Sequence, residues 1–94
     1  MNNLQQLMQM SQKLQSKMSE IQESLDEKEV SASAGGGMVT VTADGKGNVK
    51  RVEIDPTVVD PDDVEMLEDL VLAAVSEAQN RASKVYEEEM KKAT

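Results

Sequence analysis

The chain has 94 residues, with 18 acidic against 10 basic side chains, a net charge of −8, one aromatic residue, no cysteine and no histidine. These counts exclude a disulfide framework, a thiolate metal site, and catalysis that depends on histidine or cysteine. A chain this short forms one domain, and a core without large aromatic side chains leaves apolar surface for a second copy to cover. We therefore expect a single domain over residues 1–94 that forms a homodimer.

The charge is unevenly distributed along the chain. Residues 1–19 contain two lysines and no acid, and residues 80–94 contain four basic residues against three glutamates, so the two ends together carry +3. Residues 20–79 contain four basic and fifteen acidic residues, or −11. Because phosphates attract lysine and arginine, any contact with nucleic acid is expected at the two ends.

The first predicted element is a helix over residues 3–27. Its apolar side chains recur at alternating spacings of three and four, which is the heptad pattern of a helix that packs against another helix. Only a serine interrupts the series Leu4, Leu7, Ser11, Leu14, Met18, Ile21 and Leu25. Met8 and Met10 lie beside this seam, where methionine fills gaps in a core or adapts to a bound protein.

Three short strands are predicted over residues 29–55. Residues 29–34, 38–43 and 49–55 each alternate apolar and polar side chains, the period of a strand with one covered face. Asp44-Gly45 marks a hairpin turn of about five residues, and the glycines at 35–37 give the first connection freedom to take positive φ. Neither glycine cluster is a phosphate-binding loop, since that motif leads into a helix and these lead into strands.

A second long helix is predicted over residues 61–92. Asp60 is expected to cap its N-terminus, with Pro61 in the first helical position. A calcium loop is the competing interpretation, but the glycine that an EF-hand loop requires is absent. Ala74, Ala78 and Ala82 recur every four residues, so that face has little side-chain bulk and another helix can approach it closely.

The predicted fold is α+β: a long helix, a three-stranded antiparallel sheet and a long helix. At ~1.5 Å per residue the helices span about 35 and 45 Å, whereas a six-residue strand covers roughly 20 Å. Both helices must therefore extend beyond the sheet. Because the chain runs helix, sheet, helix, the two basic ends are expected at the same far end.

Three segments together resemble the YbaB/EbfC family of bacterial nucleoid-associated proteins. They are LQQLMQMSQKLQSKMSEIQESL, GGGMVTVTADGKGNVKRVEIDP and MLEDLVLAAVSEA, which cover nearly the whole chain. One departure is Ser76, where the family pattern usually has asparagine. The resemblance implies a tweezers-shaped homodimer with projecting helical arms that binds double-stranded DNA and affects nucleoid organisation and gene expression. It also implies no enzymatic activity, cofactor, metal or small-molecule substrate.

On this interpretation, basic residues near the two chain ends contact DNA phosphates. These residues are Lys13, Lys17, Arg81, Lys84, Lys91 and Lys92. Without a signal peptide or an apolar run of membrane-spanning length, the expected location is the cytoplasm and its nucleoid. The alternative is a helical, chaperone-like module without DNA binding, in which Leu4, Leu7, Met8 and Met10 hold a protein.

Overall fold

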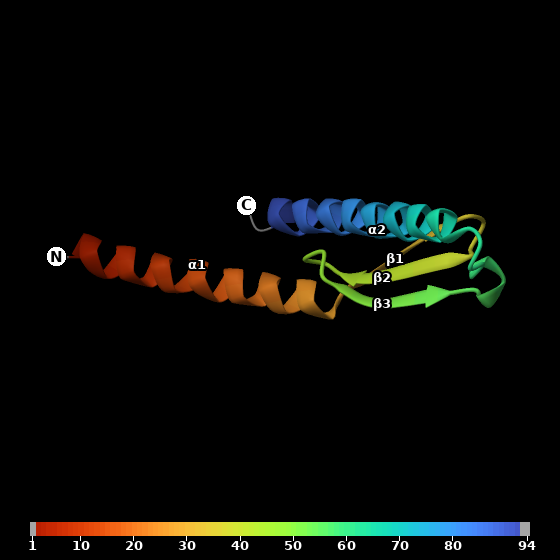
Figure 1. Cartoon of the computed structure of the whole chain (residues 1–94). Helices are drawn as coiled ribbons and strands as arrows, with labels where there is room; N and C mark the ends of the chain where they lie inside the picture. The colour runs from red at the N-terminus through yellow and green to blue at the C-terminus, as the bar shows by residue number, and fades with distance from the viewer. Residues whose placement is uncertain (1, 93–94) are drawn as a thin grey trace.

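The computed structural model describes residues 2–92 and confirms the predicted α+β architecture. The elements in order are α1 (Asn2–Glu27), β1 (Glu29–Ala34), β2 (Val39–Asp44), β3 (Val49–Ile54), the 3-10 helix η1 (Pro56–Val58) and α2 (Val64–Lys92). The molecule is elongated, with extents of 73 × 17 × 16 Å, because α1 points away from the rest of the chain (Figure 1).

The three strands form one antiparallel sheet in the order β1-β2-β3. Ala32 of β1 lies opposite Val41 of β2, and Val41 lies opposite Val52 of β3, so these apolar side chains share one face. The glycines at 35–37 all have positive φ, between 65° and 94°, as the sequence predicted. They turn the chain tightly enough for β1 and β2 to pair over their whole length.

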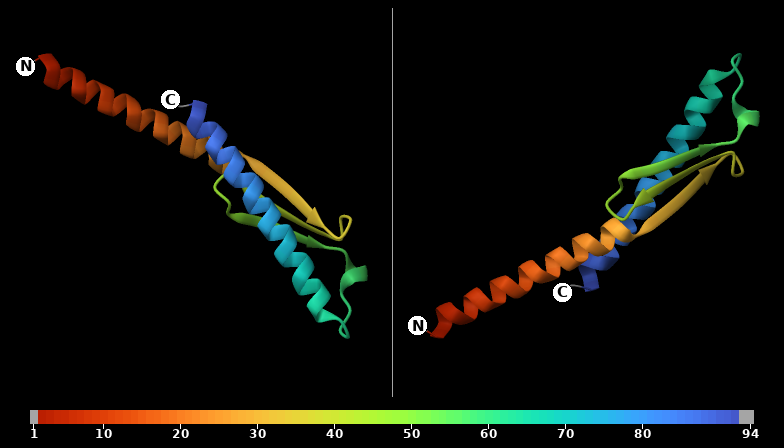
Figure 2. Two further views of the ribbon diagram at one scale, coloured as in Figure 1. Left: turned by 90° about the horizontal axis from the view of Figure 1, so that it is seen from above. Right: turned by 90° about the horizontal axis from the view of Figure 1, so that it is seen from below.

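Helix α2 packs against the apolar face of β1 and β2 (Figure 2). Ala74 and Ala78 are fully buried there, in one cluster with Val39 and Val41. Alanine's small side chain lets the helix backbone lie close to the sheet. The close approach was predicted, but the predicted partner, another helix, is wrong, because this face packs on β1 and β2. We call the sheet together with the part of α2 that covers it the body.

Strand β3 is left outside this packing. All six of its residues are exposed, and Val52 and Ile54 retain 43% and 40% of their accessible surface. Their partners across the sheet, Val41 and Val39, are fully buried on the same face. Helix α2 therefore covers the apolar face of the sheet over β1 and β2 and leaves it open over β3.

The predicted start of α2 at residue 61 is wrong by three residues. Asp60 accepts a hydrogen bond from Asp62 N at 2.9 Å, and its carbonyl accepts one from Asp63 N at 3.0 Å. Those two hydrogen bonds close a turn at residues 60–63. An aspartate side chain can either cap a helix or stabilise a turn, and Asp60 stabilises the turn. Asp63 caps the helix instead, accepting a 3.3 Å bond from Met66 N.

Helix α1 extends beyond the body, and only its last two turns contact it. Every side chain from residue 3 to residue 20 is exposed. We call residues 3–20 the arm. The last turns of α2 also extend past the sheet, but they lie against the base of α1 and do not reach its tip (Figures 1 and 2). Among residues 2–92, no helix is long and apolar enough to cross a membrane.

Candidate nucleic-acid interface

An ion-pair network joins the two helices at the base of the arm. Glu89 of α2 accepts a hydrogen bond from Lys28, which follows α1, and also pairs with Lys92 at 3.6 Å. The hydrogen bond and charge of Lys28, helped by Lys92, hold the pKa of Glu89 below its ordinary value despite partial burial. Glu89 is therefore ionised at neutral pH and holds the end of α2 to Lys28, the residue that follows α1.

A shallow cavity of about 190 Å³ lies beside this network. Lys17 and Glu20 line it from α1, and Glu89 and Lys92 line it from α2, around Ile21. The fold thus brings together Lys17 and Lys92, which are far apart in the sequence. Both belong to the predicted DNA-binding set.

Lys13 and Lys17 lie one helical turn apart on the arm, so their ammonium groups can address the same side of α1. Both side chains are exposed. Within residues 2–92 neither has a carboxylate partner within 4 Å. Neither lysine is ion-paired to a described residue, although Glu20 lies within one turn of Lys17 and, with Glu89, lines the same cavity.

Arg81 lies elsewhere than the arm. Its guanidinium donates a 2.6 Å hydrogen bond to the carbonyl of Ser31 in β1 and pairs with Glu77 at 3.3 Å. These contacts place Arg81 at the β1 edge of the body. Lys84, one turn later on α2, is exposed and without an ion-pair partner among the described residues, and Lys91 lies in the last turn. The structure therefore does not gather the six predicted residues into one cluster.

The four other basic residues are each paired with an acid. The pairs are Lys28 with Glu89, Lys46 with Asp26 at 2.9 Å, Lys50 with Asp44 at 3.6 Å, and Arg51 with Glu53 at 3.0 Å. A carboxylate this close cancels most of the field that a cation presents to a distant phosphate. Uncompensated positive charge is thus found within the predicted set, at Lys13, Lys17 and Lys84.

The residues of the alternative interpretation are also on the arm. Leu4, Leu7, Met8 and Met10 each keep between 59% and 65% of their accessible surface. They are exposed toward the tip, beyond the part of α1 that contacts α2. The structure leaves this seam without a partner in the described part of a single chain.

The hairpin turn at residues 44–48 has a role that the sequence did not predict. Its residues were interpreted only as a connection between strands, whereas in the structure the turn also contacts the end of α1 through Gly45. No motif in the sequence indicates that contact. Leu25, its partner, looked like one more member of the heptad seam.

Comparison with known proteins gives a consistent result. The profile of the YbaB/EbfC DNA-binding family matches residues 1–94. A nucleoid-associated protein of Acetivibrio thermocellus is 52% identical over 92 residues, covering 98% of this chain and 81% of that protein. A nucleoid-associated protein of Granulibacter bethesdensis is 47% identical over 94 residues, covering 100% of this chain and 88% of that protein.

A solved structure supports the fold. The uncharacterized protein HP0035 from Helicobacter pylori is similar with a TM-score of 0.67, over 80% of this chain and 87% of that protein. Its sequence identity is 20%, so the likeness concerns the arrangement of helices and strands alone.

Proposed function

Because the chain belongs to the YbaB/EbfC DNA-binding family, we propose that it is a nucleoid-associated protein that binds double-stranded DNA through the lysines of the arm. Lys13 and Lys17 contact backbone phosphates, and Lys84 and Lys91 extend the basic surface along α2. Lys92 contributes less because it is paired with Glu89. The protein works in the bacterial cytoplasm, on the nucleoid, where it affects DNA organisation and gene expression without enzymatic activity.

This proposal rests on one observation: the lysines of the arm have no ion-pair partner among residues 2–92, whereas the basic residues outside the predicted set are each paired with an acid. An ammonium group that already has a carboxylate beside it attracts a phosphate weakly, and the carboxylate repels the same phosphate. Lys13 and Lys17 have no such neighbour within 4 Å among residues 2–92, and they are carried on a helix that points away from the acidic body. DNA that approaches the arm meets positive charge first.

The proposal includes a homodimer formed through the open side of the sheet. Val52 and Ile54 of β3 continue the buried face of β2 but are themselves exposed. A second copy that covers these side chains would remove apolar surface from water and protect the unpaired edge of β3. Two arms would then project from one body and contact DNA together.

A salt titration of DNA binding tests the proposal. The double variant Lys13→Gln/Lys17→Gln should weaken binding to duplex DNA. It should also flatten the log–log salt dependence, by about 0.9 for each phosphate that the variant no longer neutralises. The matched control is Arg51→Gln, compared with the single variant Lys13→Gln, because it removes the same charge from β3, where the cation is already paired with Glu53. The control should lose affinity only through its more negative net charge.

Two outcomes would contradict the proposal. If Lys13→Gln and Arg51→Gln lose affinity equally and with the same slope, DNA responds to net charge and the arm is not the site. If the parent protein shows no salt-sensitive binding at all, the protein does not bind DNA through phosphates.

A further inference from the structure

The attachment of α1 to the body depends on few residues. Leu25 is the one fully buried side chain between residues 3 and 27, and it lies outside the core cluster beneath α2. The direction of the arm is therefore not fixed by the main hydrophobic core. It is fixed by the contacts around Leu25, together with the ion pair of Lys28 with Glu89 at the base of the arm.

The hairpin turn at residues 44–48 provides the contacts around Leu25. Gly45 N donates a 2.8 Å hydrogen bond to the carbonyl of Leu25, which satisfies one of the free carbonyls at the end of α1. Gly45 is itself buried, and a Cβ there would lie 2.9 Å from both Leu25 Cδ2 and Leu25 O. Because one of these atoms is backbone, no side-chain rotation could relieve the overlap. A second link is the ion pair between Lys46 and Asp26 at 2.9 Å.

Asp44 holds the turn in shape from the inside. It is 2% exposed and accepts bonds from Lys46 N at 2.9 Å, from Asn48 N at 3.0 Å and from Asn48 Nδ2 at 3.1 Å. Lys50 supplies the compensating charge at 3.6 Å. A carboxylate with this many donors keeps a single orientation, so it rigidifies the loop around it.

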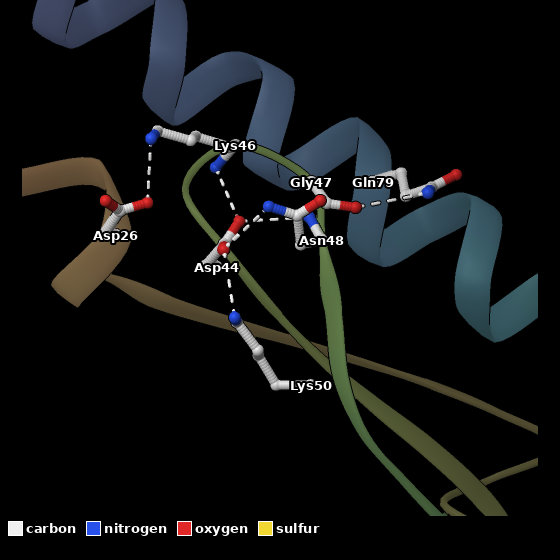
Figure 3. Close-up of polar contacts among 7 residues, drawn as sticks. All are labelled: Asp26, Asp44, Lys46, Gly47, Asn48, Lys50 and Gln79. Carbon is white, nitrogen blue, oxygen red and sulfur yellow. Dashed lines mark hydrogen bonds and ion pairs between the residues drawn. The ribbon is translucent and has the colours of Figure 1, made fainter. Parts of the chain in front are cut away.

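The turn is also tied to α2. Gln79 Nε2 donates a 3.2 Å hydrogen bond to the carbonyl of Gly47, on the opposite side of the turn from Asp26 (Figure 3). One five-residue loop thus contacts α1 through Gly45 and Lys46, the sheet through Asp44, and α2 through Gly47. It is the place where all three parts of the molecule meet.

We propose that the 44–48 turn is a positioning element that sets the direction of the arm and, through it, the place of Lys13 and Lys17 relative to the basic end of α2. Lys13 lies about 18 Å along the helix axis from Leu25 at ~1.5 Å per residue, so a change of about 10° displaces it by about 3 Å. That displacement is comparable to the length of a hydrogen bond. The inference rests on the proposed function, since the arm must bind DNA for its direction to matter.

The test uses a substitution that acts at the contact. Gly45→Ala places a methyl group against the backbone of Leu25 and should tilt or loosen α1. The chain has no cysteine, so spin labels can be attached at Gln5→Cys on the arm and Ser83→Cys on α2, both exposed. Diluting labelled with unlabelled protein restricts the measurement to distances within one chain. Pulsed electron paramagnetic resonance should show a mean distance changed by up to about 5 Å for a 10° tilt, or a broader distribution.

A glycine at the other end of the sheet is the control. Gly36 has a φ of +70°, so Gly36→Ala strains the backbone, but nothing lies within 4 Å of the added Cβ. This variant should lower the thermal midpoint and leave the distance distribution and DNA affinity unchanged. Gly45→Ala should change the distance and also reduce the affinity and the salt slope, by about 0.9 for each phosphate that the displaced arm no longer reaches.

Each result decides the inference. An unchanged distance distribution in folded Gly45→Ala overturns it, and a changed distance with unaltered DNA binding overturns the link to function. If Gly45→Ala does not fold, Lys46→Gln/Asp26→Asn removes the exposed ion pair and must broaden the distribution. An unchanged distribution there overturns the inference as well. If the parent protein does not bind DNA, the proposed function is refuted, but the distance measurement still tests whether the turn sets the direction of the arm.

Discussion

Replacing Ala78 with leucine should destabilise the protein by adding three carbons where α2 lies against the sheet. Ala78 is 0% exposed and belongs to the same buried cluster as Val39 and Val41. Overpacking a well-filled site costs about 1–3 kcal/mol, because neither the helix nor the strands can move away without disturbing the packing around them. For a domain of this size, each kcal/mol lowers the thermal midpoint by about 4–8 °C.

The comparison variant is Ala73→Leu on the same helix. Ala73→Leu changes helix propensity and side-chain volume by the same amounts as Ala78→Leu, but Ala73 is exposed. Its effect on the free energy of unfolding should therefore stay within about 0.5 kcal/mol. Thermal and urea unfolding at one fixed protein concentration measure both variants, since association makes the midpoint depend on concentration. Equal midpoints for Ala78→Leu and Ala73→Leu would refute the packing described for α2.

Two further predictions concern Asp44 and the open sheet face. Burial raises the pKa of Asp44, but the hydrogen bonds from Asn48 and Lys46 and the charge of Lys50 outweigh it and hold the pKa below its ordinary value of 3.8. The ionised Asp44 therefore stabilises the folded state above pH 3.8, and this contribution to the free energy of unfolding is lost as the pH falls through the lower pKa of the folded state. Asp44→Asn should therefore weaken the dependence of the free energy of unfolding on pH in this acidic range. Val52→Glu should shift sedimentation equilibrium toward monomer, whereas Val59→Glu, an exposed valine outside the sheet, should not.

The sequence predicted most of the elements because their signals are local. β1 has the predicted bounds, and β2 and β3 differ from them by one residue at their ends. Alternating side chains and turn residues act within a few positions, so the pattern can be interpreted without tertiary information. The alanine spacing of α2 similarly predicted which face is closely packed, but not that the sheet packs there in place of another helix.

Other features depend on a choice between alternatives that the sequence does not resolve. Asp60 and Asp63 are both suited to cap a helix, and only the observed turn shows that Asp63 does so. Arg81 was predicted as a DNA-binding residue from its position near the chain end. Its bond to Ser31, fifty residues earlier in the sequence, follows from how α2 lies on β1. The contact of Gly45 with Leu25 also joins residues far apart in the sequence.

The arrangement of charge explains how a protein with a net charge of −8 can present a surface to DNA. Fifteen of its acids fall between residues 20 and 79, whereas residues 3–19 of the arm contribute Lys13 and Lys17 and no acid. Exposed charges separated by more than about 10 Å are largely screened at 0.1 M salt, and Lys13 lies about 18 Å along the helix from Leu25 at ~1.5 Å per residue. The length of α1 therefore has an electrostatic effect: it carries the lysines beyond the range at which most acids of the body repel a phosphate. Glu20 and Glu89 are exceptions because they line the same cavity as Lys17, so Lys13 contributes the less compensated of the two charges.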